Sequence, residues 1–594
     1  MSHTFHIPVL GLGYSVDTPL KVARFGISST ASIVDDMLIE RMRKYHTELR
    51  NKEFYPIEAN EPDSRARRIM AYLNLMNKIV KTDFEELKNQ PFEPLSDITR
   101  YFQLLPESSA LKLQYRQMLE TFNQDDKSKL QSALRQQITC GSIDVNIMAK
   151  VDKLNLTGNI DLPDEECSDA LSALRGFANS NLRSSVVLSA GMNPRLYSYL
   201  EKFSCFMPDK AGDLEKKVIL KVSDFRSAFI QAKFLAKKGI WVSEFRIESG
   251  LNCGGHAFAT EGFLLGPILE EFKQRRQEMA SELFTLYQQG LAAKDMHVVN
   301  PPKMRISVQG GIGTAEENDF LLKQYEMDAT GWGSPFLLVP EVTNVDNETL
   351  LNLVEASNED FYISDSSPLG IPFNNFRRSS AEKQRLERIE KGRPGSPCVK
   401  KFLVSNTEFT AEPICTASRE YQNLKIKQLK SENLAENDFQ DRFNKIVEKI
   451  CLCEGLTSSV YRKNEILKAK ENKAVAICPG PNVAYFSSIF TLDEMVKHIY
   501  GQLNLLPNSQ RPNMFVNELN LYVDYFKKDI ENHLTDLSDK KAKYLGKFKD
   551  QLLKGIAYYK ELIPTINNQA EAYLKKMYQQ LAEAEARLMQ IPLG

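Results

Sequence analysis

The stretch IWVSEFRIESGLNCGGH, residues 240–256, joins a short apolar run to a turn that contains two glycines and a histidine. The run has the length and the apolar, aromatic character of a buried strand. Gly254, Gly255 and His256 follow it closely, in a chain of 594 residues that contains only seven histidines. Such a turn is either a simple reversal of the chain or one wall of a binding site. Its place in the fold decides between these two interpretations.

Similar apolar runs recur along residues 5–334 and alternate with amphipathic segments. Segments such as FRSAFIQAKFLAKKG predict helices that end at a glycine just before the next strand begins. Alternation of strands and helices predicts a parallel sheet. The predicted strands are HIPVLGLGY, SIDVNIMA, SSVVLSAG, KKVILKV, IWVSEFRI, MRISVQGG and DATGWGS.

Seven predicted strands come close to the eight of a TIM-type barrel, with one strand missed. An open doubly wound sheet is the alternative, although no GxGxxG fingerprint follows the first strand. From about residue 37 to 139 the chain is charged, with apolar residues such as Ile69, Leu73 and Met76 at helical spacing. We therefore predict an α/β fold: a TIM-type (β/α)8 barrel with a large helical insertion after strand 1 and a C-terminal helical appendage.

The character of the chain changes after the barrel. We assign residues 1–378 to the barrel, residues 379–515 to a mixed extension that contains cysteines, and residues 516–594 to a helical hairpin. In the hairpin, one helical pattern runs from Val516 to Ile563, and a second follows Pro564. We expect this hairpin to pack on the barrel or on a partner subunit.

Charge and hydropathy exclude several classes of protein. The chain has 76 Lys and Arg residues against 77 Asp and Glu residues, a formal net charge of -1, which disfavours a nucleic-acid partner. It has no apolar run of the roughly 18 to 20 residues that span a bilayer and no recognisable signal peptide. We therefore expect a cytoplasmic protein without a membrane partner.

Five of the nine cysteines lie in the extension. A cysteine followed by proline occurs near iron–sulfur ligands, so an iron–sulfur or zinc site is one hypothesis. The alternative is that these cysteines are small buried hydrophobic residues, and their spacing matches neither paired CxxC motifs nor ferredoxin runs. The metal question therefore stays open for Cys398, Cys415, Cys451, Cys453 and Cys478.

Four glycine-rich turns follow predicted strands, and the carboxyl ends of barrel strands are where active sites form. Glycines there allow backbone N–H groups to approach an anion closely. Gly310 and Gly311 also precede a helix predicted to begin near Thr314, and a helix N-terminus favours a phosphate. The four turns are GLGY, NCGGH, QGGIG and GWGSPF.

These motifs, in this order, resemble those of the FMN-dependent nitronate monooxygenases and of the related FMN-type enoyl-acyl-carrier-protein reductases. The resemblance covers roughly Ile7 to Arg378, apart from the helical insertion. Two positions depart from the family pattern: Gly-Leu-Gly replaces Pro-Met after the first strand, and Cys253 stands where the family has alanine. The matching segments are PVLGLGY, Val145–Met148, Gly254–His256, Gly310–Ile312, Gly333–Phe336 and Leu369–Arg377.

The resemblance implies that FMN is the cofactor and that His256 is the active-site histidine. Independently of the family, an imidazole titrates near neutral pH and therefore suits proton transfer to or from carbon. The resemblance also implies that Asn146 contacts the flavin. The other implied cofactor-binding residues are Gly11, Gly254 and Gly255 around the ring and Gly310, Gly311, Ile312, Gly333 and Ser334 at the phosphate.

We therefore predict an FMN-dependent oxidoreductase that acts on a small carbon acid or an enoyl thioester. Nitronate oxidation would use oxygen, whereas enoyl reduction would use NAD(P)H as the electron donor, and both stay open. The alternative is a non-catalytic flavin-binding scaffold or interaction module. Candidate macromolecular partners are a carrier protein and a second copy of this chain.

Overall fold

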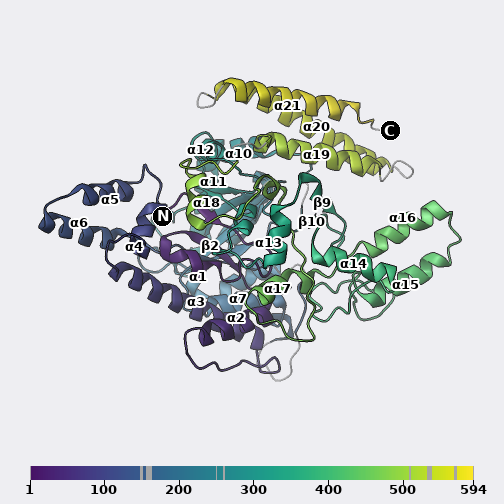
Figure 1. Cartoon of the computed structure of the whole chain (residues 1–594), viewed down its shortest axis with the longest axis horizontal. Coiled ribbons are helices and arrows are strands. Elements are labelled where there is room, and N and C mark those ends of the chain that lie inside the picture. The colour runs from purple at the N-terminus through teal and green to yellow at the C-terminus, as the bar shows by residue number, and fades with distance from the viewer. Residues whose placement is uncertain are drawn as a thin grey trace.

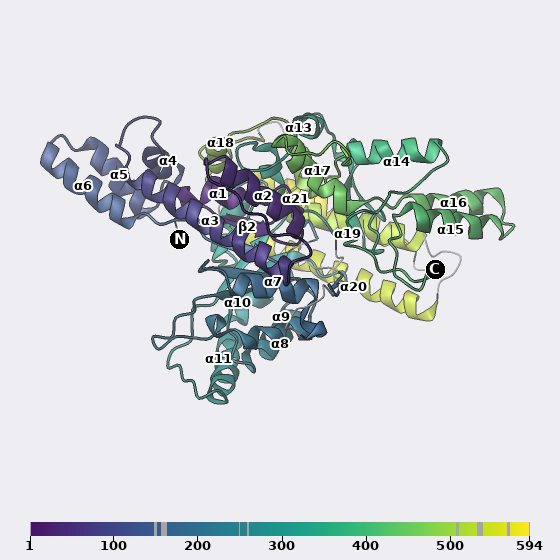
Figure 2. The ribbon, with the colours of Figure 1, turned by 90° about the horizontal axis from the view of Figure 1, so that it is seen from below.

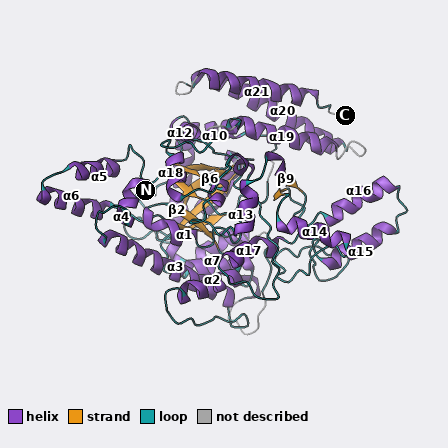
Figure 3. Ribbon diagram, viewed as in Figure 1, coloured by secondary structure: helices purple, strands orange, loops and turns teal. Residues whose placement is uncertain are grey.

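Eight parallel strands close into a barrel at the centre of the molecule (Figure 3). The computed structural model describes residues 2–147, 151–155, 163–248, 250–257, 261–506, 510–531, 538–566 and 571–592. The first strand pairs with both the second and the last, which closes the barrel and confirms the predicted fold class. The strands are β1 (Phe5–Ile7), β2 (Ser28–Ser32), β3 (Ile143–Asn146), β4 (Ser185–Leu188), β5 (Lys217–Val222), β6 (Val242–Glu248), β7 (Arg305–Gln309) and β8 (Ala329–Gly331).

The eighth strand, absent from the sequence prediction, is β2. Its sequence, SSTAS, consists of small side chains and is buried at every position. It was missed because it has neither the large apolar residues nor the alternation that indicate a strand. The helical insertion therefore follows the second strand and not the first, and the glycine turns follow β6, β7 and β8 and not the fifth, sixth and seventh strands.

The interior of the barrel carries buried charges, whereas TIM-type barrels are usually filled by branched apolar side chains. Arg246 on β6 donates to Glu244 at 2.9 Å and to Asp144 on β3 at 3.1 Å. Arg305 on β7 donates to the second oxygen of Glu244 at 3.2 Å. Burial alone would raise the pKa of Glu244, but Arg246 and Arg305 lower it to about 2. These charges cross-link β3, β6 and β7 inside the barrel.

Helices cover the outside of the barrel and form two arms. Residues 97–137 of the insertion project on one side, and residues 380–447 of the extension project on the opposite side (Figures 1 and 2). The helices around the barrel are α1 (Thr18–Val22), α7 (Asp169–Ala178), α8 (Pro194–Tyr199), α9 (Phe225–Ala236), α10 (Leu265–Gln274), α11 (Arg276–Ala292), α12 (Ala315–Lys323) and α13 (Asn347–Val354). The insertion comprises α2 (Asp36–Glu48), α3 (Ser64–Asn89), α4 (Asp97–Leu104), α5 (Ala110–Glu120) and α6 (Gln124–Gln137).

The segment after the barrel begins with a hairpin of β9 (Phe361–Ser364) and β10 (Phe373–Phe376). The helices that follow are α14 (Ser380–Glu390), α15 (Arg419–Lys430), α16 (Glu436–Val447), α17 (Leu452–Lys463) and α18 (Leu492–Ile499). The proposed domain boundaries at residues 378 and 515 stay predictions. In the parts of the chain that the structure describes, no helix combines the length and the apolar character needed to cross a membrane.

The C-terminal layer contains three described helices where the sequence predicted two: α19 (Met514–Glu531), α20 (Asp539–Leu562) and α21 (Glu571–Gln590). The first predicted helix was too long because the cap at Ser538, which accepts from the N–H of Lys541 and starts α20, was not recognised. The layer packs on the barrel: Glu518 of α19 accepts from the N–H groups of Gly250 and Leu265, at 3.2 and 2.8 Å.

Replacing Arg246 by methionine tests the buried charges. Arg246→Met leaves Asp144 and Glu244 with less compensation inside the barrel, so the free energy of unfolding should fall by about 3–5 kcal/mol in urea titrations. The matched control is Arg587→Met, because Arg587 pairs with Asp524 at 3.2 Å on the surface. The control should change the free energy of unfolding by less than about 1 kcal/mol. Equal effects of the two substitutions would contradict a structural role for the buried network.

Candidate functional site

A cavity of about 130 Å³ opens at the carboxyl ends of the barrel strands. Four residues that the sequence assigned to the site line it: Gly11, Gly254, Gly255 and His256. Its other walls include Lys221 at the end of β5, Glu248 at the end of β6, and Cys253, Phe373 and Phe402. The other six predicted site residues do not line this cavity: Asn146 ends β3, Gly310, Gly311 and Ile312 follow β7, and Gly333 and Ser334 follow β8.

The β9–β10 hairpin fixes the orientation of His256. The N–H of Ala257 donates to Pro372 at 2.8 Å, and the N–H of Asn374 donates to Gly255 at 2.9 Å. The imidazole Nε2 lies 2.8 Å from Oγ of Ser367, and Phe373 contacts the ring edge to face at 5.1 Å. These contacts hold the imidazole in place. The ring is also partly exposed and lines the cavity, so a small molecule can reach it.

Gly254 is required by the close approach of another segment. Its φ of +125° lies in the region that favours glycine, and an added Cβ would come 2.1 Å from the carbonyl oxygen of Cys478. The N–H of Gly255 donates to the same carbonyl at 3.0 Å. The extension therefore forms part of the wall of the cavity, which the sequence alone did not indicate.

Lys221 and Glu248 form an ion pair of 2.6 Å in the cavity wall. Gln309 donates to Glu248 at 2.8 Å and lies 3.3 Å from Nε2 of His6. Burial alone would raise the pKa of Glu248, but Lys221 outweighs it and holds the pKa below its usual value. This pair belongs to none of the predicted motifs, although two opposite charges at the carboxyl ends of neighbouring predicted strands are a sequence signal that indicates it.

In the loops after β7 and β8, several N–H groups lack acceptors among the described residues, whereas the carbonyl groups of the first loop are hydrogen-bonded. The buried main-chain N–H groups of Gly311, Ile312, Gly333 and Ser334 find no acceptor within the described part of the chain. The carbonyl groups of the first loop, in contrast, accept bonds from the extension. Asn482 donates to Ile312 at 2.7 Å, His498 lies 2.9 Å from the oxygen of Gly313, and Arg511 donates to Gly311 at 2.5 Å.

Asn146, at the end of β3, is a second buried group without a partner. Its residue exposure is 1%, and neither Nδ2 nor Oδ1 has a hydrogen-bond partner among the described residues. Asp144, two residues earlier on the same strand, bonds to Arg246 inside the barrel. Side chains two residues apart on a strand share a face, so Asn146 faces the barrel interior at its carboxyl end. Met148 of the same predicted motif lies outside the described residues.

Cys253 separates the cavity from the loop after β8. An added Cβ on Gly333 would come 2.6 Å from Cβ of Cys253, and Ser334 donates from Oγ to the carbonyl of Cys253 at 3.1 Å. Oγ of Ser334 also accepts from the N–H of Gly480 at 2.8 Å. Burial raises the pKa of the Cys253 thiol far above its usual value, so the thiol stays protonated. Its role is that of a packed wall and not of a nucleophile.

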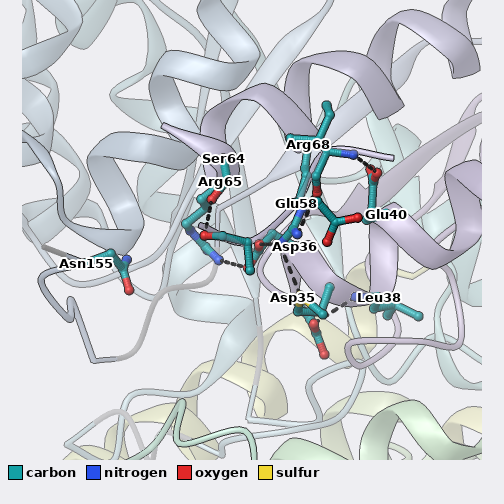
Figure 4. A network of polar contacts seen from close by, with 12 residues as sticks. Asp35, Asp36, Leu38, Glu40, Glu58, Ser64, Arg65, Arg68 and Asn155 are labelled. Carbon is teal, nitrogen blue, oxygen red and sulfur yellow. Dashed lines mark hydrogen bonds and ion pairs between the residues drawn. The ribbon is translucent and has the colours of Figure 1, made fainter. Parts of the chain in front are cut away.

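A second cavity, of about 460 Å³, adjoins the first and shares Asp169 and Phe402 with it. Figure 4 shows Arg65 and Arg68, both from α3, directed at Asp36 at the start of α2, at 2.8 and 2.9 Å. Arg65 also contacts Asp169, which lies at the start of α7. These arginines are paired within the wall, so they stabilise the packing of the insertion against the barrel.

All nine cysteines are described, and all are free thiols. Cys398 lies beside Cys415, and hydrogen bonding to Cys415 lowers the pKa of Cys398 to about 7. Cys478 instead lines the cavity at the barrel mouth, where burial raises its pKa to about 12. Throughout the described ranges, no three His, Cys, Asp or Glu side chains form a group that could hold a metal ion. The metal hypothesis therefore gains no support from the structure.

No family model matches the chain, and no curated protein matches its sequence. Among solved structures, the chain is similar to the enoyl reductase domain of MlnA from the macrolactin biosynthesis cluster of Bacillus amyloliquefaciens. The identity is 14% over 64% of this chain and 86% of that chain, with a TM-score of 0.33. It is also similar to the nitroalkane oxidase of Streptomyces ansochromogenes, with 11% identity over 63% and 76% of the two chains and a TM-score of 0.27. Likenesses of this size carry no argument about function.

The buried thiol of Cys253 predicts a selective labelling pattern. Iodoacetamide at pH 7.5 should leave Cys253 unmodified in the native protein, because the reactive thiolate is suppressed by burial. The same residue should be modified fully after denaturation in urea, as measured by mass spectrometry of peptides. Partly exposed Cys398, whose pKa is lowered, serves as the internal control and should react in the native protein. Rapid native modification of Cys253 would contradict its assignment as a packed wall.

His6 predicts a pH dependence of stability. Burial, together with Arg246, lowers the pKa of His6 to about 3. Between pH 6.5 and about 3 the unfolded chain therefore binds a proton that the folded chain does not, and stability is lost as the pH falls. His6→Asn should reduce the slope of unfolding free energy against pH by about 1.4 kcal/mol per pH unit between pH 5.5 and 4.5. An unchanged slope in urea titrations would contradict this assignment.

Proposed function

We propose that this protein is a flavin-dependent oxidoreductase that binds FMN at the carboxyl end of its barrel. The observation that carries the proposal is a set of buried polar groups without partners in the described structure. They are the N–H groups of Gly311, Ile312, Gly333 and Ser334 and the side-chain amide of Asn146. Buried polar groups in folded proteins are nearly always hydrogen-bonded, so we infer that a ligand completes them.

The two adjacent loops suit a phosphate group. Backbone N–H groups aligned at a helix N-terminus attract an anion, and α12 begins at Ala315, directly after the first loop. Glu317 lies in the first turn of this helix and accepts from the N–H of Gly313 at 2.9 Å. Its charge is compensated by Arg511, which donates to it at 2.7 Å. The negative charge of Glu317 is therefore paired within the protein, and the other acidic residue of this turn, Glu316, is exposed to solvent.

The remaining residues suit a flavin ring and a small substrate. The amide of Asn146 offers both donor and acceptor groups to the polar edge of a ring. His256 can hold or release a proton at Nε2, where the hydroxyl of Ser367 can act as donor or acceptor. Lys221 lies in the same wall, where it is paired with Glu248 at 2.6 Å. A bound flavin would supply the hydride and electron transfer that none of these side chains can provide.

The cavity is too small to hold a flavin ring without movement of its side chains. At about 130 Å³ it is smaller than the roughly 300 Å³ at the lower end of small-molecule sites. Seating a flavin ring therefore requires side chains that line the mouth, such as Phe402 and Leu403, to move aside. The same small volume favours the alternative of a non-catalytic scaffold, and the two experiments below separate these functions.

Within the flavin-dependent class, we propose a small carbon acid or an enoyl thioester as the substrate. Proton transfer at His256 beside a redox cofactor suits either compound, because each changes its number of bonds to hydrogen at carbon. The first reaction would use oxygen as the electron acceptor, and the second would use NAD(P)H as the electron donor.

Purification of the full chain tests the cofactor directly. The protein should absorb near the visible bands of a flavin and release FMN when denatured, or its apoprotein should bind added FMN. Both outcomes would follow from the partnerless groups that we assign to the phosphate and the ring. A colourless protein that cannot be reconstituted with FMN would refute the proposed function.

Replacing His256 tests catalysis separately from binding. His256→Asn should retain FMN, whereas turnover of the carbon acid or thioester that the wild type accepts should fall about 10²- to 10⁴-fold. His297→Asn is the matched control, because His297 is exposed, lies before β7 at the amino end of that strand, and does not line the cavity. Wild-type turnover in His256→Asn would contradict the assigned role and favour the scaffold.

A further inference from the structure

We propose that the extension positions the phosphate-binding loop after β7, with Arg511 as the main positioning residue. Cofactor binding would then require Asn482, His498 and Arg511 of the extension as well as the barrel. This inference rests on the proposed function, because it concerns how the loop recognises the phosphate of FMN. It differs from the sequence prediction, which assigned the whole cofactor site to residues 1–378.

Arg511 is held by at least three separate acceptors. Its side chain is 4% exposed, and its nitrogens donate to Glu317 at 2.7 Å, to Asn482 at 2.7 Å and to the carbonyl of Gly311 at 2.5 Å. An added Cβ on Gly313 would come 2.6 Å from the guanidinium carbon, so the loop packs directly on the guanidinium. A planar group with donors in several directions is needed to make these contacts together.

The contact to Gly311 determines where the next N–H points. A trans peptide is planar, and its carbonyl and N–H groups point in opposite directions. Because Arg511 holds the carbonyl of Gly311 on the side of the extension, the N–H of Ile312 is directed to the other side. That N–H is one of the buried groups without an acceptor in the described chain. Arg511 therefore orients a donor that it does not touch.

The neighbouring peptides are fixed by the same network. Asn482 holds the carbonyl of Ile312 at 2.7 Å, and Glu317 accepts from the N–H of Gly313 at 2.9 Å on the opposite side of that peptide. His498 lies 2.9 Å from the carbonyl oxygen of Gly313. Burial lowers the pKa of His498, so the neutral ring donates from Nε2 to this carbonyl. Three consecutive carbonyl groups are thus bound by three residues of the extension.

The arrangement separates two functions within one loop. The carbonyl groups of Gly311, Ile312 and Gly313 accept hydrogen bonds from the extension. The N–H groups of Gly311 and Ile312, which have no acceptor in the described chain, are left for a phosphate. Without Arg511, Asn482 and His498, these carbonyl groups would be unsatisfied and the peptides could rotate. Phosphate binding would weaken, whereas the ring cavity, which these three side chains do not line, would stay in place. The loss should therefore depend on the phosphate of the ligand.

Comparing FMN with riboflavin, which lacks the phosphate, tests this inference. Arg511→Lys keeps a positive charge beside Glu317 but cannot contact Glu317, Asn482 and Gly311 at once. Titration of the apoprotein, followed by quenching of flavin fluorescence, should show FMN binding weakened about 10- to 100-fold. Riboflavin binding should change less than about twofold, because the ring site is unaltered.

Two further variants keep the test decisive. Asn482→Ala removes one carbonyl contact and one contact to Arg511, so it should show the same selective loss of FMN binding. The matched control is Arg175→Met combined with Asp63→Asn, which removes another largely buried ion pair, of 2.5 Å, away from the loop. The control should bind both flavins as the wild type does. Thermal unfolding of each apoprotein shows whether a variant has lost its fold.

The outcomes distinguish this inference from the proposed function. If the wild type binds neither flavin, the proposed function and this inference both fail. If the wild type binds FMN, and folded Arg511→Lys and Asn482→Ala bind it equally well, this inference alone is wrong. Equal weakening of FMN and riboflavin would also overturn it, because the effect would then not depend on the phosphate.

Discussion

The buried ion pair between Arg511 and Glu317 joins the two parts of the chain on which the proposed site depends. Glu317 belongs to α12, which follows the barrel strand β7, whereas Arg511 belongs to the extension. The N–H of Met514, at the start of α19, also donates to Glu317 at 2.8 Å. One carboxylate therefore anchors the barrel, the extension and the C-terminal helices at a single point. Buried charges of this kind are stable only when every partner is in place.

The same requirement governs the interior of the barrel. Arg246 holds Glu244 and Asp144, and Lys221 and Gln309 hold Glu248 nearer the mouth. The charged side chains give way at the carboxyl end to groups that have no partner in the described chain, such as the amide of Asn146. The charged groups inside the barrel are thus paired within the protein, whereas both amide atoms of Asn146, at the carboxyl end of β3, are left for a ligand.

Local sequence signals predicted most of the barrel and part of the site. Gly254, Gly255 and His256 line the mouth because a strand followed by a glycine turn ends at the carboxyl edge of a parallel sheet. Ser28–Ser32 was missed because its small side chains carry no hydrophobic period. The pair of Lys221 and Glu248 is indicated only when the ends of neighbouring predicted strands are compared, because neither strand alone carries a sign of the contact. The roles assigned to His256 and to the phosphate loops stay predictions.

The contribution of the extension was beyond the reach of local signals. Arg511 and Gly311 are 200 residues apart in the chain, and their contact arises from tertiary packing. Nothing in the sequence around Asn482 or His498 indicates that these side chains bind a glycine loop of the barrel. The motifs along the chain predict a cofactor site within residues 1–378, because contacts between distant segments leave no local signal in the sequence.

A crystal structure of the full chain with FMN tests the central claim most directly. We predict that the phosphate lies within about 2.7–3.2 Å of the main-chain nitrogens of Gly311, Ile312, Gly333 and Ser334. The carbonyl oxygens of Gly311 and Ile312 should remain bound to Arg511 and Asn482 in the same crystal. A phosphate bound elsewhere, or a barrel mouth that stays closed at saturating FMN, would contradict the account.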